Sequence, residues 1–85
     1  MLEKSKDNIK FLELQNMKLS KVPDNLPSLK HLETLLLNSN HLTKLPETIG
    51  RLKNLNNLGI ANNNIKKFPD SIALLQNLER IDIVW

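Results

Sequence analysis

A repeat of 23 residues is the feature that most constrains the fold of this chain. Four segments begin at Ile9, Leu32, Leu55 and Leu78, with no insertion between them. Counted from these residues, positions 1, 4, 6, 11, 14, 18 and 21 are apolar in three full units, and positions 1, 4 and 6 are apolar in a partial fourth. All 24 positions are filled, whereas a chain that is 40% hydrophobic would fill about 10 by chance. This register therefore holds most of the structural information in the sequence.

The first half of each unit has the pattern of a strand followed by a tight bend. Positions 4 and 6 alternate as in a short strand with one buried face, which predicts four strands in one parallel sheet. Position 9 is Asn40 in the second unit and Asn63 in the third. Their amides can satisfy backbone groups that the bend removes from the sheet. The first unit has Met17 there, so we expect its bend to be irregular or shielded.

The second half of each full unit has a proline at position 15, followed by a carboxylate. We expect the proline to set φ for a short helical or 3₁₀ return, with the carboxylate in its first turn near the positive end of the dipole. The three dipeptides are Pro23-Asp24, Pro46-Glu47 and Pro69-Asp70.

The second and third units, LETLLLNSNHLTKLPETIGRLKN and LNNLGIANNNIKKFPDSIALLQN, resemble the leucine-rich repeat pattern LxxLxLxxNxLxxLPxxIxxLxx. The resemblance covers residues 9–85, and its LPxxI return resembles that of Ras-group-related plant proteins, Ras-pathway scaffolds and many bacterial repeat proteins. It implies an α/β fold, a right-handed leucine-rich-repeat solenoid with a short parallel sheet on its concave face and short helical or 3₁₀ segments on its convex face. The implied function is protein–protein interaction, as in a signalling scaffold.

The register also predicts the domain organisation. We expect one leucine-rich-repeat domain over 9–85, with units starting at 9, 32, 55 and 78, and residues 1–8 as a short polar N-terminal cover. Solenoids need terminal units with a polar outer face. Because the fourth unit stops one residue before its asparagine position, we expect an exposed apolar edge there.

Side chains that flank the buried strand residues point to the concave side, where we predict a surface that binds a protein partner. Phe11 and Leu36 are the expected anchors, since an aromatic or leucine exposed on a sheet often marks one. The alternative is that they are ordinary surface residues, because single exposed apolar side chains are common. Ala61 is also expected on this face. The predicted partner-binding residues are Phe11, Glu13, Thr34, Leu36, Asn38 and Asn57.

Two other interpretations stay open. In one, the chain is a fragment or a self-assembling repeat unit that forms a homo-oligomer end to end through its uncapped edge. In the other, it is a targeting or regulatory segment of a larger signalling protein or bacterial effector. The predicted end-to-end contact residues are Leu78, Ile81, Ile83, Val84 and Trp85.

Composition argues against catalysis and cofactors. The chain has no cysteine, and its two histidines, His31 and His41, fall at expected bends without partners for acid–base chemistry. Phosphate-loop, dinucleotide, HExxH and EF-hand motifs are missing. We therefore predict a protein that is not an enzyme, with no catalytic residue, cofactor or metal.

The charge pattern gives little support for nucleic acid or membrane as a partner. Net charge is +3, and no run approaches the ~20 apolar residues of a membrane span. A basic row of Lys21, Lys44 and Lys67 precedes each carboxylate by three residues, so we expect local pairing to neutralise it. The charged start resembles no secretory signal, and a cytoplasmic location is the default expectation.

Overall fold

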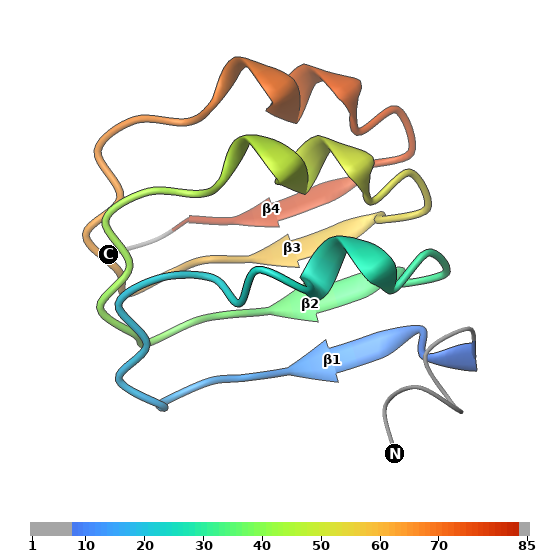
Figure 1. Cartoon of the computed structure of the whole chain (residues 1–85). Coiled ribbons are helices and arrows are strands. Elements are labelled where there is room, and N and C mark those ends of the chain that lie inside the picture. Colours follow the sequence, from blue (N-terminus) through green and yellow to red (C-terminus); the bar gives the residue numbers. More distant parts are fainter. Residues whose placement is uncertain (1–7, 84–85) are drawn as a thin grey trace.

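The computed structural model describes residues 8–83, which form a four-stranded parallel sheet in chain order (Figure 1). Short 3₁₀ helices form a second layer that stacks in the same order, because each connection between successive strands contains one helix. The predicted α/β solenoid, with strands on one face and 3₁₀ returns on the other, is confirmed. The strands are β1 (Phe11–Glu13), β2 (Thr34–Leu36), β3 (Asn57–Gly59) and β4 (Arg80–Asp82). The helices are η2 (Leu26–Ser28), η3 (Glu47–Arg51) and η4 (Asp70–Leu74).

Strand pairing follows the 23-residue register without a slip. Leu12 of β1 lies beside Leu35, Leu35 beside Leu58, and Leu58 beside Ile81. Equivalent positions of successive units therefore form straight rows across the sheet. The predicted N-terminal cover lies outside the described residues except for Asn8, which is exposed.

The core consists of the repeat's apolar positions, and it is tightest where a unit has neighbours on both sides. Leu35, Leu37, Leu58 and Ile60 are completely buried, with 0% exposure. Each such side chain stabilises the fold by about 1.5–3 kcal/mol through removal of apolar surface from water. The two central units thus supply most of the hydrophobic stabilisation.

Among the described residues, β4 is the last strand of the sheet, and its apolar side chains are more exposed than those of the central strands. Ile81 and Ile83 are 39% and 45% exposed, although they hold the positions that are completely buried in β2 and β3. Phe68 was expected in the core but is 37% exposed, because no described unit packs beyond it. Each unit therefore buries its neighbour's apolar positions as well as its own.

The Asn40 side chain joins the first two units at their bends. Its Oδ1 accepts hydrogen bonds from the backbone N–H groups of Met17 (2.9 Å) and Leu19 (3.1 Å). Its Nδ2 donates to the carbonyls of Leu14 (2.8 Å) and Leu37 (3.0 Å). Asn40 is 5% exposed and is the one buried polar residue in the described part of the chain. One buried amide thus replaces hydrogen bonds that the bend takes from the sheet.

Asn63 repeats this bonding one unit later. Its Oδ1 accepts from the Leu42 N–H (3.0 Å), and its Nδ2 donates to the carbonyls of Leu37 (2.9 Å) and Ile60 (3.2 Å). Both asparagines reach back to the preceding unit. The predicted role of position 9 is therefore correct.

The bend of the first unit is irregular, as expected from Met17. Asn16 and Lys18 both have positive φ (57° and 56°), whereas the bends of the next units have a single such residue each, Ser39 and Asn62. The Met17 side chain is 55% exposed. Its backbone N–H is satisfied by Asn40 from the next unit, so the bend holds without an asparagine of its own.

Proline starts two of the three returns as predicted. Pro46 and Pro69 are extended and directly precede η3 and η4, which have Glu47 and Asp70 in their first turns. The first return differs, because η2 begins only at Leu26 and has no acidic residue in its first turn. The expected helical position of Asp24 is therefore wrong.

Replacing Asn40 with alanine is expected to destabilise the fold by about 2–4 kcal/mol, because it leaves buried N–H and C=O groups without partners. Asn64→Ala is the matched control, since Asn64 is exposed in the adjacent bend position of the next unit. Urea unfolding followed by circular dichroism measures both. Equal losses in the two variants would contradict the role given to Asn40.

Candidate functional site

The candidate site is the concave face of the sheet, onto which strand positions 3 and 5 project. Phe11 is 59% exposed and lies beside Thr34. Leu36 is half-buried and lies between Glu13 and Gly59. Phe11 and Leu36 are therefore diagonal neighbours on adjacent parallel strands, and both project onto this face.

Gly59 forms the floor of this face beside Leu36. A Cβ atom at Gly59 would lie 2.9 Å from Nδ2 of Asn38 and 3.0 Å from Cδ2 of Leu36. Both side chains therefore lean over the glycine and cover the β3 backbone. Glycine is needed here because it lets these two side chains approach the strand closely.

Asn38 is held in this position by hydrogen bonds to both neighbouring units. Its Oδ1 accepts from the Ala61 N–H (2.7 Å), and its Nδ2 donates to Oε1 of Gln15 (2.7 Å). Gln15 in turn donates to Glu13. This polar chain of hydrogen bonds holds the side chains of Glu13, Gln15 and Asn38 in place.

The remaining predicted residues differ in how far they reach solvent. Glu13 is exposed, whereas Thr34 and Asn57 are half-buried in the row that begins with Phe11. Ala61 was expected on the exposed surface but is 7% exposed, because it lies in the polar chain beneath Asn38. Of the predicted edge residues, Leu78 is half-buried. Val84 and Trp85 lie outside the described residues.

Gln15 belongs to the site although it is missing from the predicted set. Its contact with Asn38 joins residues one repeat apart at position 7. A row of amides at the same position of successive units was the available signal. The contact shows that part of Asn38's bonding capacity is used inside the protein.

The concave face is more acidic than the whole chain. Its strand rows and the rim residues before them contain four carboxylates and two cations, although the chain has a net charge of +3. These groups are Glu13, Glu33, Glu79, Asp82, Lys10 and Arg80. Most lysines of the chain therefore lie outside these rows and rim positions.

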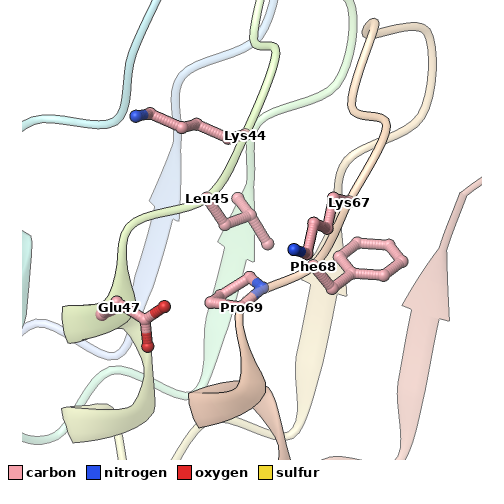
Figure 2. Close-up of a pocket in the computed structure, with 6 residues that line it drawn as sticks. All are labelled: Lys44, Leu45, Glu47, Lys67, Phe68 and Pro69. Carbon is pink, nitrogen blue, oxygen red and sulfur yellow. The ribbon is translucent and has the colours of Figure 1, made fainter.

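A groove lies on the other side of the molecule, between the segments that lead into η3 and η4 (Figure 2). It has a volume of about 250 Å³ and is lined by Lys44, Leu45, Glu47, Lys67, Phe68 and Pro69. It is open to solvent, and charges of both signs stand at its edge, so its lining selects no ligand class.

The lysine row pairs less than expected. Among residues 8–83 one ion pair forms, between Lys21 and Asp24 at 4.0 Å, and both side chains are highly exposed, so it adds little stability. The expected pairs of Lys44 with Glu47 and of Lys67 with Asp70 are absent from that range. These long side chains extend into solvent, where screening makes fixed pairing unfavourable.

The histidines and the side chains that could bind a metal do not gather at one place in the described part of the chain. His31 and His41 are both exposed, and they lie in different repeat units. Three or more metal-binding side chains do not meet anywhere in residues 8–83. Within the same range, no helix has the length and apolar character to cross a membrane.

A family profile described as a leucine-rich repeat region matches residues 6–85. The structure is similar to that of a leucine-rich-repeat protein from Leptospira interrogans, with a TM-score of 0.56 and 23% sequence identity. The similarity covers 99% of this chain and 34% of the other, so the chain spans about a third of that protein. Among curated protein sequences, none matches the chain significantly.

The polar chain around Asn38 gives a test of the site's construction. Gly59→Ala should displace the Asn38 amide and cost about 1–3 kcal/mol, and Asn38→Ala should cost a similar amount through the loss of the same hydrogen bonds. Because both substitutions break one arrangement, the double variant should be little less stable than either single variant. Urea unfolding measures the three free energies of unfolding, and additive losses would contradict the coupling.

Proposed function

The chain belongs to the leucine-rich repeat family, and from this premise we propose that it is a non-catalytic module that binds a protein partner through the concave face of its sheet. Protein interaction is the typical role of the family. The observation that favours the concave face is Phe11, a large aromatic side chain that is 59% exposed next to the half-buried Leu36.

Phe11 and Leu36 suit the role of anchors because a partner would remove apolar surface from water at both. Aromatic anchors in the centre of an interface supply much of its binding free energy. Leu36 is already partly covered by its neighbours, so it loses little side-chain freedom on binding. Glu13, Thr34 and Asn57 surround the pair and offer polar contacts at its rim.

The fixed polar chain adds to this argument. Asn38, Gln15 and Glu13 are joined by hydrogen bonds in the free protein. A partner therefore meets an ordered surface, which lowers the entropy cost of association. The acidity of the face favours a protein partner over a nucleic acid, whose phosphates would be repelled by Glu13 and Asp82.

The alternative proposal concerns a longer protein. Because the chain spans about a third of the Leptospira protein that it resembles, it would then be a targeting or regulatory segment of a larger signalling protein or bacterial effector. In that case the concave face would supply the targeting contact.

Phe11→Ala and Leu36→Ala are expected to weaken capture of the partner at least about tenfold, because each removes an apolar anchor. The amount of partner captured from an extract of the source cells is measured by mass spectrometry. Calorimetry with the purified partner then gives the affinity of each variant. Met17→Ala is the matched control, since Met17 is 55% exposed on a bend outside the concave face.

A partner whose binding falls with both concave variants and not with Met17→Ala supports the proposal. If all three variants bind every captured protein equally well, the concave face is not the binding surface. Circular dichroism of each variant establishes that the losses do not come from unfolding.

A further inference from the structure

Among the described residues, no strand pairs with the outer edge of β4, so this edge can offer backbone groups to a partner strand. The Arg80 N–H donates to the Asn56 carbonyl (3.0 Å), and the Asp82 carbonyl accepts from the Ile60 N–H (2.9 Å). Backbone groups of successive strand residues point to opposite sides. The N–H and C=O of Ile81 therefore point away from β3, and no described strand lies beyond them.

The side chains at this edge also lack cover. Ile81 and Ile83 are 39% and 45% exposed, whereas Leu58 and Ile60 at the equivalent positions of β3 are 0% exposed. An exposed apolar edge strand is a ready template for pairing with another chain. Within residues 8–83, the edge thus combines hydrogen-bonding groups that no described strand pairs with and partly exposed apolar side chains.

We propose that β4 pairs antiparallel with β4 of a second copy of this chain, across a two-fold axis at Ile81. Ile81 of each copy then exchanges both backbone hydrogen bonds with Ile81 of the other, because its N–H and C=O face the open edge. The two sheets become one sheet of eight strands, which brings the concave faces of both copies onto a common surface.

The charges on β4 favour this arrangement. In the antiparallel register centred on Ile81, Arg80 lies opposite Asp82 of the second copy, and Asp82 lies opposite its Arg80. These flanking residues are non-hydrogen-bonded pairs, in which side chains approach most closely. Two-fold symmetry gives the ion pair twice, so the strand is complementary to itself.

Head-to-tail stacking of copies is disfavoured by the same charges. If β1 of a second copy continued the parallel register after β4, Phe11 would lie opposite Arg80 and Glu13 opposite Asp82. Like charges directly opposite each other destabilise a sheet. The two-fold contact also closes after two copies, whereas head-to-tail contacts propagate. The second copy therefore joins through β4 rather than through β1.

This contact is independent of the proposed partner site, because Phe11 and Leu36 lie on β1 and β2. It is tested by light scattering after size exclusion at concentrations up to about 1 mM, a range that covers weak association. The variants are Arg80→Asp, Asp82→Arg and the double charge swap that combines them. Lys66→Asp is the matched control, since it makes the same charge change at an exposed residue away from the edge.

The unchanged chain is expected to dimerise as concentration rises, with Lys66→Asp behaving alike. Each single charge reversal creates two like-charge contacts and should weaken dimerisation at least about tenfold, and the charge swap should restore it. A chain that stays monomeric throughout would overturn the proposal. So would a dimer that the single reversals leave intact, or a charge swap that fails to restore association.

Discussion

The regular stacking of the repeat units depends on the hydrogen bonds that the side-chain amide of Asn40 makes at the bends. Each bend removes backbone groups from the sheet, and apolar burial alone cannot satisfy them. Asn40 bonds the bend of the first unit and the strand end of its own unit at once. Asn63 does the same one unit later, so the register of the leucines is locked at its bends as well as in its core.

An unbroken register has a direct consequence for function. Because equivalent residues of successive units lie side by side, buried positions repeat while the flanking positions are free to differ. The concave face uses this freedom: Phe11 and Leu36 provide apolar surface, and Gly59 makes room for Asn38. At β4 the same geometry leaves Ile81 uncovered. The scaffold is uniform, and under the proposed function its specificity would lie in the few residues that depart from the repeat.

The scaffold could be predicted from the sequence because its residues recur every 23 positions and each has one physical task. Strand positions, asparagine bonding and the irregular bend at Met17 all follow from that recurrence. The rest depends on contacts between particular side chains, which have no period. The link between Gln15 and Asn38, the burial of Ala61 and the exposure of Phe68 depend on what each neighbouring unit supplies. The lysine row shows the converse, since suitable spacing alone does not produce ion pairs in solvent.

Hydrogen exchange of single backbone amides tests the central claim that asparagine bonding across units holds the solenoid together. The N–H groups of Met17 and Leu19 lie in an otherwise exposed bend and bond to Asn40. They are expected to exchange nearly as slowly as the N–H of Leu37, which bonds within the sheet to Gly59. Exchange of both at the rate of an unprotected amide, with Leu37 still protected, would contradict the account.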